Sequence, residues 1–136
     1  GNNMTSKVFQ TQIKVRSEHI DHFEHVNNVQ YVKWVNHAAH LHWEQETSKR
    51  QREKYTWMVV RHQIDYKKQA FLNDELILKT WVDKFTYVAS IRTVQILRAD
   101  DYSICATAQS KWCFLDKANL KPMRIPQDIK EPFIES

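Results

Sequence analysis

One segment, from about Asn28 to about Thr47, carries apolar residues at helical spacing on two rows rather than one. The first row holds Val32, Val35, Ala39 and Trp43, and the second holds Trp34, Ala38 and Leu41. A helix of ~19 residues is roughly 28 Å long. Two apolar rows require burial on more than one side. A curved sheet wrapped around the helix would provide that burial, so this segment constrains the fold most.

Strand-like segments stand before and after the predicted helix. Residues 7–15 alternate between apolar and polar side chains, which is the period of two of a half-buried strand. Four more such segments follow a charged connector, at 55–66, 75–87, 88–98 and 102–115. The short gap around Asp100-Asp101 makes its flanking strands antiparallel hairpin partners. The order strand, helix, four strands predicts an α+β fold.

Turns in this chain cannot rely on glycine. Gly1 is the only glycine, and we take it as the remnant of an expression tag. Asn and Asp are the other residues that tolerate a positive φ. We therefore expect turns at Asn73-Asp74, at Asp100-Asp101 and at 116–119. The proline-marked segment that follows is expected to hold one helical turn, at Gln127–Lys130.

The length of 136 residues fits a single domain. We place this domain at residues 7–130, with a tag or tail at 1–6 and a C-terminal tail at 131–136. Apolar residues make up 42% of the chain, which favours a folded globule over a disordered chain. No apolar run approaches the roughly 20 residues that span a bilayer, and no basic-then-apolar leader opens the chain. We expect no membrane span.

The two cysteines, Cys105 and Cys113, lie in one predicted strand. At ~3.3 Å per residue they would be roughly 26 Å apart, beyond the reach of a disulfide. Neither is adjacent to a His or to a helix start, so neither is a strong candidate nucleophile. Free thiols indicate a reducing compartment, and we expect the protein to be cytoplasmic.

The segment between the first strand and the helix carries the candidate chemistry. Asp21 lies just ahead of the helix start, with His25 four residues later. Unpaired N–H groups at a helix N-terminus suit an oxyanion, and a carboxylate beside them can attack a carbonyl or direct water at it. The same residues fit a structural interpretation, in which Asp21 forms an Asx turn and Asn27 caps the helix. The residues alone leave both interpretations open.

This segment resembles a motif of hot-dog-fold acyl thioesterases. His25-Val26-Asn27-Asn28, with Asp21 before it and Tyr31 after it, is similar to Asp-x-x-x-His-Val-Asn-Asn-x-x-Tyr. Segments 64–76 and 121–126 are also similar, and the resemblance runs from about residue 7 to about residue 130. The similarity is to plant acyl-ACP thioesterases and to bacterial acyl-CoA thioesterases related to 4-hydroxybenzoyl-CoA thioesterase. It implies a hot-dog fold, an antiparallel five-stranded sheet wrapped around one long central helix.

The resemblance also implies an activity, the hydrolysis of an acyl thioester, with acyl-CoA as the expected substrate. Asp21 aligns with the carboxylate that acts as nucleophile or general base, and backbone amides near His25 and Val26 would polarise the carbonyl. The His25 ring would orient water or form a hydrogen bond within the loop. Of Asn27 and Asn28, one is expected to cap the helix and the other to face substrate.

Three residues depart from the pattern of these families. Gln69 stands where plant acyl-ACP thioesterases carry a catalytic Glu, and we keep it as a substrate-binding candidate. Phe23 stands where they carry an Asn, and Glu24 occupies a place often filled by Gly. These departures leave Asp21 with more of the catalytic work.

The formal net charge of +4 favours an anionic partner, and coenzyme A carries several phosphates. Lys67, Lys68 and Arg92 are the candidates for holding those phosphates at the mouth of the cleft. Nucleic acid is disfavoured because no zinc-finger spacing, recognition helix or aromatic RNA-binding motif is present.

Metal and other cofactors are not expected. His37, His40 and Glu44 have the spacing to share one helix face, but no fourth ligand accompanies them. The alternative functions are a non-catalytic protein that binds acyl-CoA or acyl carrier protein, and an acyl-ACP thioesterase. A hot-dog dehydratase is disfavoured, because it would present its His and its carboxylate from different segments, whereas Asp21 and His25 lie in one segment. Because the family builds its cleft between two chains, we expect a homodimer or a homotetramer made of two dimers.

Overall fold

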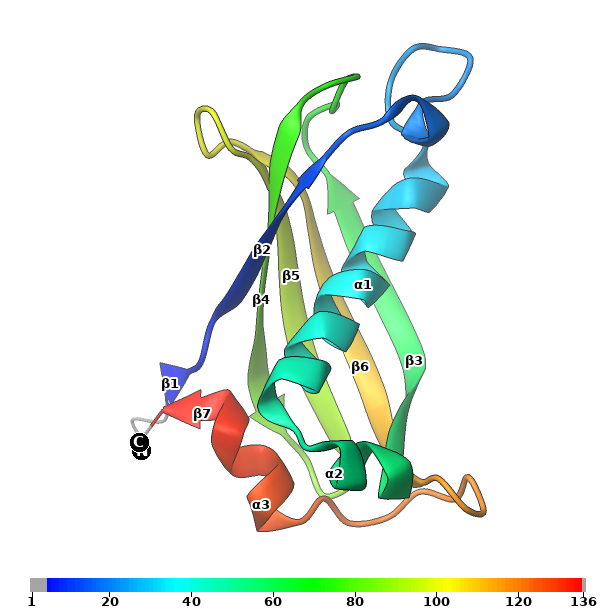
Figure 1. Ribbon diagram of the computed structural model, residues 1–136, viewed down its shortest axis with the longest axis vertical. Helices are drawn as coiled ribbons and strands as arrows, with labels where there is room; N and C mark the ends of the chain where they lie inside the picture. The colour runs from blue at the N-terminus through cyan, green and yellow to red at the C-terminus, as the bar shows by residue number, and fades with distance from the viewer. Residues whose placement is uncertain (1–4, 136) are drawn as a thin grey trace.

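The computed structural model describes residues 5–135. Five strands form one antiparallel sheet in the order β2-β4-β5-β6-β3: β2 (Phe9–Lys14), β3 (Tyr55–Tyr66), β4 (Glu75–Phe85), β5 (Ala89–Arg98) and β6 (Ile104–Asp116). One long helix, α1 (Asn28–Glu46), lies across one face of this sheet (Figure 1). The predicted α+β architecture, with five antiparallel strands and one long helix, is confirmed.

Helix α1 begins at the predicted residue because Asn27 caps it. Asn27 Oδ1 accepts a hydrogen bond from Val29 N–H at 2.8 Å. The buried residues of α1 are Tyr31, Trp34, Val35, Ala38, Ala39 and His42. Both predicted apolar rows contribute to this set, although Val32, Leu41 and Trp43 are only half-buried. His42 is 0% exposed and is a buried polar residue that neither row revealed.

The main core lies between α1 and the central strands. Leu78 of β4, Val94 and Ile96 of β5 and Ala108 of β6 are all fully buried and pack with the α1 side chains. Register shifts interrupt the sheet between Val59 and Arg61 and between Val82 and Lys84. Such β-bulges increase local twist and bend a strand, which helps the sheet to follow the helix.

Residues 49–54 form a short helix, α2 (Lys49–Lys54), where the sequence analysis expected only a charged connector. A capping box starts it: Gln51 N–H donates to Ser48 Oγ at 3.1 Å, and Ser48 N–H donates to Gln51 Oε1 at 2.9 Å. The Ser-x-x-Gln spacing is the sequence signal for this helix. Strand β3 begins directly after it.

The turns adopt positive φ at one predicted residue and at three unexpected ones. Asn73 has a φ of 71°, as predicted, and the others are Glu24, Tyr102 and Leu120. Tyr102 directly follows Asp101, and the Asp101 Oδ1 atom accepts a hydrogen bond from Ser103 N–H at 2.9 Å. The Asp side chain therefore closes an Asx turn, while its neighbour takes the left-handed conformation.

The two ends of the described chain lie side by side. β1 (Thr5–Ser6) pairs with β7 (Ile134–Glu135), and Figure 1 shows them together at the lower left, beside the main sheet. The predicted helical turn is present as α3 (Gln127–Lys130), and the 3-10 helix η2 (Glu131–Phe133) connects it to β7. Ordered structure thus continues into both segments that were assigned to tails, and the limits at 7 and 130 stay a prediction.

The expected tag falls mostly on residues 1–4, which lie outside the described residues, as does residue 136. Within residues 5–135, no helix has the length and apolar character needed to cross a membrane.

Candidate active site

The loop before α1 folds into a small hairpin that brings Asp21 and His25 together. It follows the 3-10 helix η1 (Ser17–His19), and Ile20 and Val26 form an isolated antiparallel bridge. Asp21 N–H donates a hydrogen bond to the carbonyl of His25 at 3.0 Å. These main-chain contacts hold both predicted residues directly ahead of the helix.

The Asp21 carboxylate is only partly occupied by local hydrogen bonds. Its Oδ1 atom accepts a hydrogen bond from Phe23 N–H at 2.9 Å, which closes the Asx turn of the structural interpretation. The same oxygen lies 3.8 Å from His25 Nδ1, too far for a hydrogen bond. Within residues 5–135, Asp21 Oδ2 has no hydrogen-bond partner. The turn therefore leaves one carboxylate oxygen for a substrate or a water.

His25 Nδ1 is buried and has no hydrogen-bond partner in the described part of the chain. Buried polar atoms without a partner are rare in folded proteins and are destabilising. The ring stacks against Phe23, with ring centroids 6.1 Å apart. This nitrogen is closed to solvent and faces Asp21, so the role of orienting a water stays a prediction.

The structure corrects one of the two predicted oxyanion donors. Val26 N–H donates to the carbonyl of Ala70 at 3.0 Å, so it cannot polarise a thioester. His25 N–H has no partner within residues 5–135, and neither does the N–H of Asn28, the first residue of α1. An unpaired amide at this position is typical of the first turn of a helix.

The loop after β3 is fastened to the start of α1. Ala70 N–H donates to the hydroxyl of Tyr31 at 3.2 Å, and the Ala70 carbonyl accepts from Val26. Tyr31 is 2% exposed, and burial raises its pKa to about 12. The hydroxyl therefore stays protonated and has a structural role. Gln69 precedes Ala70, so it lies in the loop that contacts the Asp21 hairpin.

Lys67 and Lys68 are exposed at the start of the same loop. Both of their N–H groups donate to the carbonyl of Cys105, at 2.7 and 3.2 Å. Gln69 is also exposed. The loop that holds Lys67, Lys68 and Gln69 therefore lies next to the helix start that holds Asn27 and Asn28. These five are predicted substrate-binding residues. The Asn27 side chain is used as the helix cap, and Asn28 is exposed.

Arg92 does not lie with these lysines, and its predicted place at the cleft mouth is wrong. It is 6% exposed and lines a cavity under the C-terminal half of α1. Arg92 Nη1 donates to His42 Nδ1 at 2.9 Å and to Thr80 Oγ1 at 3.0 Å. The cause is strand alternation, because Arg92 shares its sheet face with the buried Val94.

A second polar cluster under α1, formed by His62, Ser110 and Asn36, is not predicted by the sequence. His62 of β3 contacts Ser110 through Nδ1, at 2.5 Å from Oγ, and Asn36 through Nε2, at 2.9 Å from Oδ1. Ser110 is the register partner of both His62 and Arg92. No sequence motif signals this group, because its members come from three elements far apart in the chain.

The three potential metal ligands on α1 do not form a three-ligand cluster. His40 Nε2 lies 3.1 Å from Glu44 Oε1, on the exposed side of the helix. Among residues 5–135, no three His, Cys, Asp or Glu side chains come together as a metal site.

The fold is shared with solved thioesterase structures. The probable thioesterase YbaW from Escherichia coli superimposes with a TM-score of 0.80 at 26% identity, over 90% of this chain and 94% of that one. A 1,4-dihydroxy-2-naphthoyl-CoA thioesterase from Synechocystis gives a TM-score of 0.82 at 17% identity, over 93% and 96%. A Staphylococcus aureus protein solved in complex with CoA gives 0.83 at 17%, over 97% and 85%. The hot-dog fold is thereby confirmed.

The sequence comparison agrees with the superpositions. No curated protein matches the chain. The model of the thioesterase-like superfamily, however, matches residues 15–133. That range contains the Asp21 hairpin, the helix and all strands of the sheet except the first, β2. The protein therefore belongs to the thioesterase-like superfamily.

Proposed function

We propose that the protein hydrolyses an acyl thioester, with acyl-CoA as substrate, to a free acid and a thiol. The Asp21 hairpin carries this proposal. It presents a carboxylate with one unpaired oxygen directly before a helix whose first N–H is also unpaired. Superfamily membership supports the reaction class.

The two polar parts of the site have complementary roles in this reaction. The N–H groups of Asn28 and His25, at the positive end of α1, donate hydrogen bonds to the thioester oxygen and stabilise the negative charge that develops on it. Asp21 attacks the carbonyl carbon or removes a proton from an attacking water. The thiolate then leaves without needing strong help from an acid. Where Asp21 is the nucleophile, water next hydrolyses the acyl–Asp21 anhydride and releases the free acid. The His25 ring, which lies beside Asp21 and is partly exposed, orients the water.

The choice of coenzyme A rests on charge and on the relatives. Lys67 and Lys68 are exposed on the loop that contacts the start of α1, where they suit the phosphates of CoA. One structural neighbour was solved with CoA, and another is a CoA-thioester hydrolase.

A hydrolysis screen tests the proposal. Acyl-CoAs of graded chain length, together with aromatic acyl-CoAs, are incubated with the protein, and free thiol is measured. We expect release of CoA with at least one of these acyl groups. Binding of every acyl-CoA without thiol release would instead favour a non-catalytic acyl-binding protein. Release only from acyl carrier protein would identify an acyl-ACP thioesterase.

A further inference from the structure

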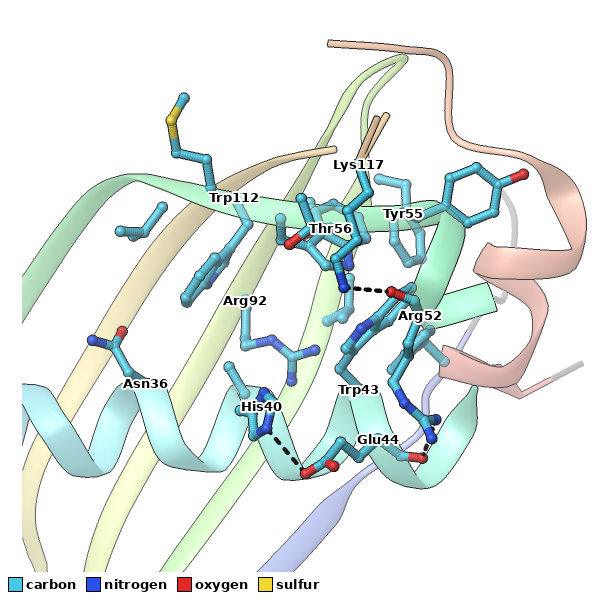
Figure 2. A pocket seen from close by; sticks show the side chains of 18 residues that line it. Asn36, His40, Trp43, Glu44, Arg52, Tyr55, Thr56, Arg92, Trp112 and Lys117 are labelled. Carbon is cyan, nitrogen blue, oxygen red and sulfur yellow. Dashed lines mark hydrogen bonds and ion pairs between the residues drawn. The ribbon is translucent and has the colours of Figure 1, made fainter. Parts of the chain in front are cut away.

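A large cavity lies away from the Asp21 hairpin, between the C-terminal half of α1 and the strands β3, β5 and β6 (Figure 2). Its volume of about 720 Å³ is in the range of sites for drug-sized ligands. Much of its wall is aromatic, with Trp43, Tyr55, Trp57, Phe85 and Trp112 among the lining residues. Such a wall suits the hydrocarbon part of a ligand.

Arg92 places a positive charge in this aromatic wall. Figure 2 shows its side chain reaching from the sheet toward α1. Its Nη1 atom donates to His42 and Thr80, and Nε and Nη2 make no hydrogen bond within residues 5–135. A guanidinium has five N–H donors, so most of them are unused.

The partners of Arg92 do not neutralise it. Burial lowers the pKa of His42 to about 3 and that of Arg92 to about 10, so at neutral pH the imidazole is uncharged and the guanidinium is charged. No carboxylate of the described residues lies within ion-pair distance of Arg92, and the charge of Asp83 acts on it only from farther away. A buried charge without a directly paired counter-charge is unfavourable. An anion in the cavity would supply the missing partner.

Other cavity residues point to the same kind of ligand. Arg52 and Lys117 add two cations to the lining. The one acidic residue among the lining residues, Glu44, is paired with His40. The cavity therefore combines apolar walls, unused donors and an excess of positive charge.

We propose that this cavity binds the carboxylate of an apolar organic acid, with Arg92 as its counter-charge and the aromatic walls around its hydrocarbon part. The carboxylate has two possible sources. It belongs either to a free acid or to the far end of an acyl group whose other end is the thioester. The binding proposal does not depend on hydrolysis at Asp21.

Calorimetric titration with octanoate and with 1-octanol tests the role of the charge. The two probes share a chain length, and only octanoate carries a carboxylate. We expect the parent protein to bind octanoate at least ~10-fold more tightly than octanol, as charge-assisted hydrogen bonds require. Arg92→Met should remove this preference and leave octanol binding unchanged. Its melting temperature is measured alongside, because the substitution removes both a buried charge and the donor to His42 and Thr80.

Two further variants keep the test decisive. Arg61→Met removes an exposed arginine of β3 outside the cavity and should bind octanoate like the parent. Arg92→Gln is a second neutral variant, which replaces Arg92→Met if the latter does not fold. The proposal is overturned if the parent shows no preference for octanoate, or if the neutral Arg92 variants keep that preference.

A competition experiment separates the two sources of the carboxylate. Octanoate is titrated into the Asp21→Asn variant, which should not cleave the thioester, after saturation with the mono-CoA thioester of hexadecanedioic acid. Its chain is long enough for the roughly 21 Å along α1 from the helix start to His42, the partner of Arg92. Displacement of octanoate that needs the free carboxyl of the thioester, and is not seen with hexadecanoyl-CoA, identifies the far end of the acyl group as the ligand. Undisturbed octanoate binding identifies a free acid. Both outcomes support a carboxylate site, and each uses a binding readout.

Discussion

The hydroxyl of Tyr31 accepts a hydrogen bond from the backbone N–H of Ala70, 39 residues away in the sequence, at 3.2 Å. The carbonyl of Ala70 in turn accepts a hydrogen bond from Val26 N–H at 3.0 Å. One residue of the loop after β3 thus contacts both the helix and the hairpin that holds Asp21 and His25. The proposed catalytic and phosphate-binding segments are joined through this contact.

Replacing Tyr31 with Phe tests that junction. The variant keeps the buried ring but leaves the Ala70 N–H without an acceptor, which should cost about 1–3 kcal/mol of unfolding free energy. Urea denaturation measures the loss. Tyr87→Phe, at a residue that is 72% exposed, is the matched control and should be neutral. Equal stability of the two variants would show that the hydrogen bond contributes nothing.

The fold could be predicted because it follows from local patterns. The apolar rows of α1 and the alternation of the strands both report which side is buried, and Asn27 caps the helix where its residue type suggests. Helix α2 differs, because its six residues are all charged or polar and none is buried, so no apolar pattern predicts it. Its sequence signal is the capping-box spacing of Ser48 and Gln51 alone.

In the candidate site, too, residues close in the sequence could be paired from a motif, and residues far apart could not. Asp21 and His25 are four residues apart, so a short motif could pair them, and the structure places them in one hairpin. Arg92 was misplaced because its residue type suggested exposure, whereas its strand position turns it inward beside Val94. Its contact with His42 joins residues 50 apart in the chain, a relationship that one sequence does not display.

The exposed edge of the sheet predicts self-association. β3 is an edge strand of 12 residues, and Val60 on it is 55% exposed. Long edge strands with apolar side chains favour pairing with another chain. We expect a homodimer, or a tetramer of two dimers, and expect Val60→Lys to weaken it in light-scattering measurements. Val8→Lys, at a similarly exposed residue, is the control. A parent protein that is monomeric at micromolar concentration would refute this prediction.

The lowered pKa of the buried His42 predicts that the folded protein loses stability in mild acid. Burial, with a smaller effect of the Arg92 charge, lowers its pKa from 6.5 to about 3. Between these values the unfolded chain binds a proton that the folded chain does not, so the unfolding free energy falls as pH falls. One such group contributes up to about 1.4 kcal/mol per pH unit. The burial of His62 also lowers its pKa and adds an effect of the same sign.

Urea denaturation of His42→Gln across this pH window measures the contribution. The variant should show a shallower decline of stability with falling pH than the parent does. His37→Gln, at an exposed residue of the same helix, should decline like the parent. An unchanged slope in His42→Gln would mean that this imidazole is not held neutral by the fold.

The proposed binding of CoA phosphates by Lys67 and Lys68 predicts that the Michaelis constant for acyl-CoA depends on salt. If their charges hold CoA phosphates, KM for acyl-CoA should rise with ionic strength, because added salt screens exposed charges. Replacing both with Ala should raise KM at low salt, flatten this dependence and leave kcat nearly unchanged. Lys121→Ala, at another exposed lysine, should behave like the parent. A KM that does not respond to salt in the parent protein would argue against the assignment.

Asp21 gives the most direct test of the proposed mechanism. Asp21→Asn keeps an oxygen that can accept the Phe23 N–H bond, so the Asx turn and the melting temperature should survive. Loss of an essential nucleophile or base should lower kcat by at least ~10²-fold. His25→Ala should cost less, because the proposed oxyanion donors are backbone amides.

Asp116→Asn is the matched control for Asp21→Asn, since Asp116 Oδ1 closes an equivalent turn with Ala118 N–H in the segment after β6, away from the proposed site. It should leave turnover unchanged, which separates a lost charge at the site from a general effect of removing a turn carboxylate. The mechanism is wrong if Asp21→Asn releases thiol from acyl-CoA as fast as the parent. If neither the parent nor Asp21→Asn hydrolyses acyl-CoA but both bind it, the protein binds acyl groups without cleaving them. The role of Asp21 is then to close the Asx turn.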